Sequence, residues 1–228
     1  MKTMAYREFS MEMLEAVCGN RIQYDFSIVG GVTRDLRNDI SKMVLNKLKI
    51  FKPQLDELVD IYSNNYTLGL KNKGVGVISK EDVYRLSAVG PFARAAGVPI
   101  DVRNETEDIL PWKEAGFEVV TEAAGDVWAR NLVRLKELYV SIKIIENVIN
   151  GLPEGELAVE FKGFPSGEAI NRLEAPRGEL FYYAKGNKTQ ILERLKIKAP
   201  TFSNVASMVH DFQTTDYASA PALIDSHA

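Results

Sequence analysis

The chain has 228 residues, of which 46% are hydrophobic and 26% are charged, and its formal net charge is -3. This length and composition are typical of a globular protein with one sizeable core. They exclude a disordered chain, a collagen-like repeat and a disulfide scaffold. Because the net charge is slightly negative, no general basic field attracts nucleic acid, and we expect no nucleic-acid partner.

The sequence offers few ligands for a metal. Cys18 is the only cysteine, and His210 and His227 are the only histidines. The chain therefore lacks the cysteine pairs that hold zinc, nickel or an iron–sulfur cluster. A lone cysteine is usually buried and inert, so we interpret Cys18 as structural. We expect no metal and no cofactor to be held by this chain alone.

No targeting segment is apparent. Residues 1–12 mix charged and apolar side chains, unlike the apolar block of a signal peptide. The longest strongly apolar stretches are far shorter than the roughly 20 residues that span a bilayer. We therefore expect a cytoplasmic chain with no direct membrane span, so that any link to a membrane must run through a partner.

The N-terminal half is expected to be mainly helical. Apolar residues at helical spacing predict a helix over about 4–17, ended by Gly19, and a long helix over about 34–63, which Pro53 should kink or break. The other expected segments are an extended piece over 21–29, a loop over 67–77, a short helix from Ser79, another after Gly90-Pro91, and an irregular surface excursion over 98–121.

The clearest helix is expected over 126–149. Its apolar face includes Leu135, which we expect in the main core, and Arg130 and Arg134 fall mostly on the opposite face. With Asp126, these two arginines recur every four residues. They could form a polar site or an ordinary exposed ladder of ion pairs, and composition alone favours the ladder.

The character of the sequence changes after Pro153. Three strands are expected over 168–173, 178–184 and 190–197, with a turn over 185–187, and helices follow over 201–212 and 221–225. The fold class is therefore α+β and predominantly α-helical, with long core helices and a small antiparallel sheet in the C-terminal third. We expect one domain over 1–228, with a helical core (about 1–152), a β-containing portion (about 153–200) and C-terminal helices (201–228).

The segment 174–179 stands out between two expected strands. Pro176 removes a backbone donor and Gly178 relieves steric limits, so the chain between them is held in a specific bend. Arg177 is thereby presented on a stiff support, and its guanidinium offers five fixed donors at any working pH. It could orient an anion or a substrate beside a metal. Equally, it could be a structural arginine paired with Glu174 or Glu179.

Three ordered blocks resemble one family, and the resemblance covers nearly the whole chain. The blocks are Gly19–Asp35; Gly74–Asp82 with Val89-Gly90-Pro91, Arg94–Gly97 and Asp101–Arg103; and Glu174–Glu179 with Tyr182–Gly186 and Lys196–Asn204. The family that they resemble is the large subunit of membrane-bound, energy-converting nickel–iron hydrogenases, together with its relative, the quinone-site (49 kDa-type) subunit of respiratory complex I.

The resemblance favours the hydrogenase branch, because complex I proteins usually carry lysine where this chain has Arg177. In that branch the matching arginine lies beside the [NiFe] centre, contacts the diatomic ligands of the iron and helps to handle protons. This implies a catalytic role for Arg177 beside the metals rather than as a metal ligand. Supporting roles are implied for the residues around it, namely Glu174, Pro176, Gly178, Gly90, Pro91, Arg94 and Pro200.

The chain departs from the family in its metal ligands. Family members hold nickel and iron with two Cys-x-x-Cys motifs, which are absent here. The chain therefore resembles an excised middle part, a truncated version or a divergent paralogue. The implied parent reaction is H2 evolution or oxidation coupled to ion translocation, with an iron–sulfur small subunit and membrane ion-translocating subunits as partners. A quinone-linked subunit and a non-catalytic scaffold are the alternatives.

Overall fold

The computed structural model describes residues 2–22, 24–105, 111–160 and 162–227. Helices dominate, and a small antiparallel sheet lies in the C-terminal third, so the expected α+β class is confirmed. The backbone forms two compact units. The first comprises Met1–Asn64 and Ile145–Gly163, and the second comprises Asn65–Ile144 and Phe164–Ala228.

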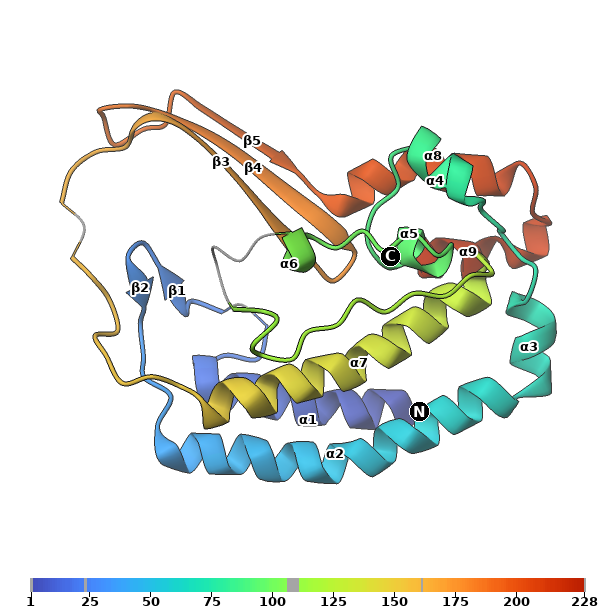
Figure 1. The fold of residues 1–228 in the computed structure, drawn as a ribbon, viewed down its shortest axis with the longest axis horizontal. Coiled ribbons are helices and arrows are strands. Elements are labelled where there is room, and N and C mark those ends of the chain that lie inside the picture. The colour runs from blue at the N-terminus through green and yellow to red at the C-terminus, as the bar shows by residue number, and fades with distance from the viewer. Residues whose placement is uncertain (1, 23, 106–110, 161, 228) are drawn as a thin grey trace. The chain divides into compact units, whose positions relative to one another are not determined.

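The first unit is built on two helices that pack side by side, α1 (Lys2–Cys18) and α2 (Asn38–Asn64) (Figure 1). Helix α1 ends where expected, because Gly19 adopts a φ of 79° and its N–H donates to the Glu15 carbonyl at 2.8 Å. The extended piece expected over 21–29 contains β1 (Ser27–Ile28), which pairs antiparallel with β2 (Gly31–Val32) just after it.

Helix α2 differs from the expectation at Pro53. The helix continues through this proline instead of breaking there. Leu48 and Leu55 are both buried, one on each side of Pro53. Burial of apolar side chains on both sides offsets the single backbone hydrogen bond that a proline removes.

The second unit contains most of the remaining helices. They are α3 (Tyr66–Asn72), α4 (Lys80–Arg85), α5 (Pro91–Ala95), α6 (Val102–Glu105), most of α7 (Val127–Asn150), α8 (Pro200–Phe212), the 3-10 helix η1 (Tyr217–Ser219) and α9 (Ala220–His227). The expected starts of two helices are confirmed. Ser79 caps α4 by accepting from the Asp82 N–H at 3.0 Å, and Asp126 caps α7 by accepting from the Ala129 N–H at 2.8 Å.

Two expected loops are wrong in part. The segment 67–77 begins with helix α3, because the Asn65 side chain accepts from the Leu68 N–H at 2.9 Å and starts a new helix. The segment 98–121 is not wholly a surface excursion, since Asp101, Val102 and Phe117 are buried. Within this segment, residues 106–110 lie outside the described residues.

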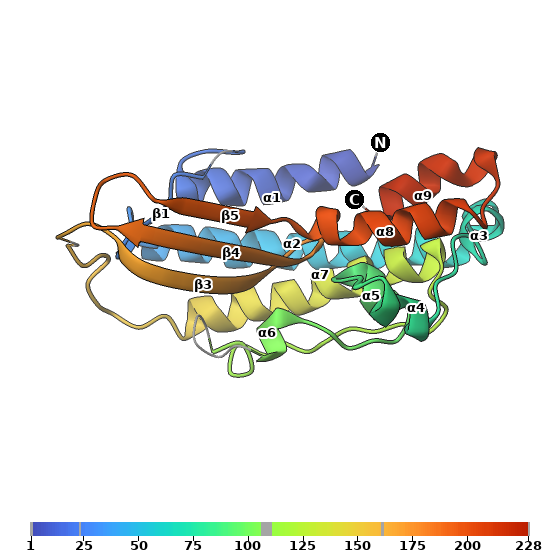
Figure 2. The same ribbon diagram turned by 90° about the horizontal axis from the view of Figure 1, so that it is seen from above.

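The sheet has the order β3-β4-β5 and is antiparallel throughout, with β3 at Ser166–Ala175, β4 at Gly178–Asn187 and β5 at Arg194–Lys198 (Figure 2). The expected turn over 185–187 is wrong. These residues continue β4, because β3 is long enough to pair with them, as Gly167 does with Gly186. The connection to β5 comes later in the chain.

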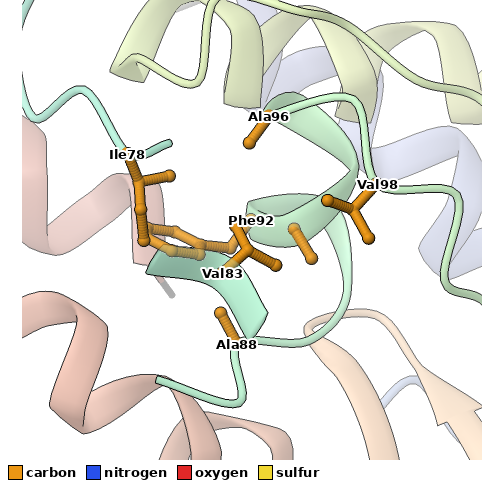
Figure 3. Close-up of a cluster of buried hydrophobic side chains, with 7 residues drawn as sticks. Ile78, Val83, Ala88, Phe92, Ala96 and Val98 are labelled. Carbon is orange, nitrogen blue, oxygen red and sulfur yellow. The ribbon is translucent and has the colours of Figure 1, made fainter. Parts of the chain in front are cut away.

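The core of the second unit surrounds α5. Phe92 lies among the other buried residues of one cluster, namely Ile78, Val83, Ala88, Ala93, Ala96 and Val98 (Figure 3). The N-terminal part of α7 is buried on every side, including Arg130, which is 0% exposed. The expectation that Arg130 belongs to an exposed ladder of ion pairs was therefore wrong. Leu135 is only half-buried, so the main core contact of α7 is made instead by Val133.

Candidate functional site

A tight turn between β3 and β4 presents Arg177, as the sequence suggested. The turn consists of Pro176 and Arg177, and Gly178 follows with a φ of 127°. Gly90 packs directly against this turn, because a β-carbon on Gly90 would lie 2.3 Å from the Arg177 carbonyl oxygen. The turn is thus held against the start of α5, where Gly90 is the N-cap and Pro91 the first residue.

Five of the eight site residues inferred from the sequence line one cavity of about 850 Å³. They are Arg94, Glu174, Pro176, Arg177 and Pro200. Gly90 and Gly178 do not line the cavity but contact each other through their backbones at the turn, and Pro91 follows Gly90 as the first residue of α5. Pro200 reaches the wall as the first residue of α8. The structure thus brings the eight residues together, and their catalytic and supporting roles stay predictions.

The centre of the cavity wall is an ionic cluster around Arg94. Its guanidinium, 1% exposed, contacts Asp101 at 3.0 Å, Glu137 at 2.8 Å and Glu174 at 2.8 Å. Arg103 adds a second guanidinium, whose Nη2 lies 2.8 Å from Asp101. The two glutamates come from distant parts of the chain, since Glu137 is on α7 and Glu174 is near the end of β3.

Burial changes the acidity of two carboxyl groups in this cluster. It raises the pKa of Glu137 and of Glu174, although the guanidinium of Arg94 acts in the opposite direction. The Glu174 carboxylate also accepts from the Val102 N–H at 3.3 Å. Groups with shifted pKa values beside a cavity are typical of functional sites, although structural networks also produce them.

Arg177 does not pair with the two glutamates that were considered as its partners. Glu174 bonds to Arg94, and Glu179 accepts from the Arg172 Nε at 2.6 Å. Neither glutamate therefore pairs with Arg177, and the structural interpretation of this arginine as their partner was wrong. Its side chain is exposed at the cavity wall. An exposed guanidinium in this place can donate to a group inside the cavity.

A second buried cluster was not predicted from the sequence. Arg130 Nη2 donates to Asp211 Oδ2 at 2.8 Å and Arg130 Nη1 donates to Ser226 Oγ at 3.0 Å. Burial lowers the pKa of Arg130 to about 10, so its guanidinium stays charged at neutral pH. The spacing of Asp126, Arg130 and Arg134, four residues apart, was the signal in the sequence. It cannot reveal that other segments of the chain bury this part of the helix.

His227 completes this second cluster. Burial lowers the pKa of its imidazole to about 4. Because a carbonyl can only accept, the contact of Nδ1 with the Leu223 carbonyl at 2.9 Å places the ring proton on Nδ1. The ring also stacks on Phe92, with 4.4 Å between centroids. This cluster joins α9 to α7 and α8, and we interpret it as structural.

The residues of the chain do not fit a [NiFe] centre. The thiolate ligands that such a centre requires would have to come from Cys18 alone. Among the described residues, no group of three or more His, Cys, Asp or Glu side chains could hold a metal ion. The donor set of this chain therefore does not match the ligands that nickel and iron need.

Comparison with known proteins identifies the family. The chain matches the family described as the 49 kDa subunit of respiratory-chain NADH dehydrogenase, over residues 1–164 and 157–227. The chain belongs to this family. The residues that match the 49 kDa subunit family include Arg94 and the turn of Pro176 and Arg177.

Relatives within the family carry two kinds of name. The chain is 36% identical, over 90% of its length, to the carbon monoxide-induced hydrogenase of Rhodospirillum rubrum. It is 33% identical, over 96% of its length, to the membrane-bound hydrogenase subunit alpha of Pyrococcus furiosus. It is 32% identical, over 90% of its length, to a D-type subunit of the NADH-quinone oxidoreductase of Chloroherpeton thalassium.

The chain spans 57%, 56% and 53% of the lengths of these three relatives, or about half of each. Within the part of the chain that the structure describes, no helix has both the length and the apolarity needed to cross a membrane.

Proposed function

We propose that this chain is part of the large subunit of a membrane-associated redox complex, of the energy-converting hydrogenase type. In this proposal the chain supplies one wall of the redox site, with Arg177 as the donor that orients the group in the cavity. The complete subunit would evolve or oxidise H2 and couple that reaction to ion translocation.

The observation that carries the proposal is the placement of Arg177. It stands on a two-residue turn at the wall of a cavity, and neither adjacent glutamate pairs with it. A guanidinium keeps its charge at any working pH, and a short turn between two strands is a rigid support for it. Both properties suit a site where electrons and protons are transferred. The two hydrogenase relatives are 36% and 33% identical to the chain, which supports the same branch.

The proposed partners are those that the family resemblance implies. They are an iron–sulfur small subunit, which delivers electrons, and membrane subunits, which translocate ions. The complex would lie at the inner face of the cell membrane, with this chain attached through those partners. The name of the Pyrococcus furiosus relative, a membrane-bound hydrogenase subunit, supports this arrangement.

A quinone-linked subunit is the second candidate, and the relative from Chloroherpeton thalassium favours it. In that case the cavity would hold a quinone headgroup instead of a metal centre, and Arg177 would donate to a quinone oxygen. A scaffold of the same fold, without chemistry of its own, is the third candidate.

The test compares Arg177→Lys with Arg194→Lys in the complex purified through a tag on this chain. Arg194 is an exposed arginine on the same sheet and does not line the cavity. We expect Arg177→Lys to lower H2 evolution from a reduced one-electron donor by about tenfold or more, an order-of-magnitude figure for losing a two-point contact in the reaction. Arg194→Lys should leave the rate unchanged.

Two outcomes would decide against the hydrogenase proposal, and a third would decide against the role of Arg177. Quinone reduction without H2 evolution would establish the second candidate. A complex with neither activity would favour the scaffold. Equal rates for the wild type and Arg177→Lys would remove Arg177 from the reaction, whichever activity is found.

A further inference from the structure

The ionic cluster around Arg94 contains more negative than positive groups. Two guanidinium groups, from Arg94 and Arg103, face three carboxyl groups, from Asp101, Glu137 and Glu174. Arg94 and Asp101 are each 1% exposed, and the Glu174 side chain is 3% exposed. An uncompensated charge at such a depth is costly, so a buried cluster of this kind tends to bind a proton.

The contacts identify which carboxyl groups have one guanidinium partner and which has two. Asp101 accepts from both guanidinium groups, with Arg94 Nη1 at 3.0 Å and Arg103 Nη2 at 2.8 Å, and it also accepts from the Arg103 backbone N–H at 3.0 Å. Its negative charge is therefore well compensated. Glu137 and Glu174 share the single guanidinium of Arg94, which contacts each of them at 2.8 Å.

We propose that Glu137 and Glu174 share one exchangeable proton at neutral pH, which makes the cavity wall a proton-binding site. Binding forms one O–H bond on a carboxylate oxygen of the pair, and release breaks it. The site opens toward the cavity, because Arg94 and both glutamates line it. The upward pKa shifts of both glutamates have the direction that this arrangement requires.

Other charged groups facing the cavity do not remove the imbalance. Arg134, one turn before Glu137 on α7, stays charged but donates from Nη2 to the Ser226 carbonyl at 2.6 Å, and the charges that act on the Glu137 carboxyl are those of Arg94, Arg103 and Asp101. Arg177 is exposed at the wall, where its charge is screened by water. Arg172 on β3 is paired with Glu105 and Glu179. At the start of α8, the lining residues Ala199, Pro200 and Thr201 carry no charge.

The proposal deepens the proposed function and rests on it for its purpose, because both hydrogen evolution and quinone reduction consume protons at the reduced group. A glutamate pair in the wall could store a proton beside that group. Proton binding by this pair, however, can be measured on the purified chain with no partner and no electron donor.

The experiment is a pH titration of the full chain labelled with carbon-13 at the glutamate carboxyl groups and followed by NMR. We expect one transition, belonging to the pair, well above the ordinary glutamate pKa of about 4.3. Glu137→Gln and Glu174→Gln each leave two carboxylates facing two guanidinium groups. Both variants should therefore lose the high transition, whichever residue is changed.

Glu118→Gln is the matched control. Glu118 is exposed and bonded to Lys143 at 2.7 Å, which lowers its pKa, so this variant should keep the high transition. Circular dichroism of each variant verifies its fold, and the wild-type titration is informative even if one variant fails to fold.

Two results would overturn the proposal. One is a wild-type chain whose glutamates all titrate at or below the ordinary value. The other is a high transition that persists in both Glu137→Gln and Glu174→Gln. Because neither result depends on turnover, failure here is distinguishable from failure of the Arg177 experiment, and each can occur without the other.

Discussion

Gly90 and Gly178 lie backbone against backbone, at the point where α5 meets the turn that carries Arg177. A β-carbon on Gly90 would lie 2.5 Å from the Gly178 Cα, and one on Gly178 would lie 2.8 Å from the Gly90 nitrogen. Both residues also have positive φ values, of 71° and 127°. Two independent constraints, space and backbone conformation, therefore require glycine at both positions.

The first prediction concerns this pair of glycines. Gly90→Ala should lower the free energy of unfolding by more than the roughly 1–3 kcal/mol of backbone strain alone, since the new methyl group also clashes with Arg177. Chemical denaturation measures the loss. Gly155→Ala is the control, because nothing lies within 4 Å of a β-carbon there, and it should change stability by less than about 0.5 kcal/mol. Equal losses in the two variants would contradict the packing described.

The second prediction concerns the buried pair of Arg130 and Asp211, both 0% exposed. Asp211→Ala should destabilise the chain by roughly 3–5 kcal/mol, because it leaves the Arg130 guanidinium buried without its anion. Asp39→Ala, which removes the exposed partner of Arg37, should cost less than about 1 kcal/mol. Denaturant unfolding of the three proteins tests this, and a loss below about 1 kcal/mol for Asp211→Ala would show that the pair is solvated.

The third prediction is a pH dependence from His227. Its folded-state pKa of about 4 lies below the unfolded value of 6.5, so between these pH values only the unfolded chain takes up the proton. Stability from this group is therefore complete above about pH 6.5 and is lost as the pH falls toward 4, by at most about 3 kcal/mol.

His227→Phe isolates this effect, since a phenyl ring can keep the contact with Phe92 and cannot titrate. The difference in unfolding free energy between wild type and His227→Phe should shrink or reverse as the pH is lowered through that window. A difference independent of pH would mean that His227 has an ordinary pKa. His210→Gln, at a partly exposed histidine, serves as the comparison.

The fourth prediction concerns metal content. A chain with Cys18 as its only thiol should retain no stoichiometric nickel or iron after dialysis. Elemental analysis of the purified chain measures this directly. About one nickel per chain, resistant to dialysis, would show that oxygen and nitrogen ligands form a metal site outside the thiolate pattern of the family.

The elements that depend on local signals could be predicted from the sequence. The periodicity of α7, the Ser79 cap and the glycine that ends α1 all act within a few residues, and the structure has each of them. Asn65 shows where local reasoning fails. Its position after an apolar stripe is typical of the end of one helix, whereas its side chain caps the next one.

The site could be predicted only in part. The turn of Pro176 and Arg177 was recognisable from proline and glycine placement, together with the family resemblance. The partners of Arg94 were not, because Glu137 and Glu174 are 43 and 80 residues away in sequence. Arg130 was misplaced for a related reason. A polar residue opposite an apolar stripe is buried only when other segments cover it, and the helix alone cannot reveal them.

The carboxylate of Asp126 has a consequence for how the chain tolerates change. One oxygen caps α7, and the other accepts from the Gly74 N–H at 2.8 Å, beside the bond of the Val127 N–H to the Val75 carbonyl at 3.0 Å. These contacts, which we call the clasp, join the two ends of the segment 75–126, which contains α4, α5 and α6. The entropy of closing a loop grows only slowly with its length, by about 0.6 kcal/mol per doubling. Extra residues at its exposed positions, such as Glu114, should therefore be accommodated far more readily than any change at the clasp itself.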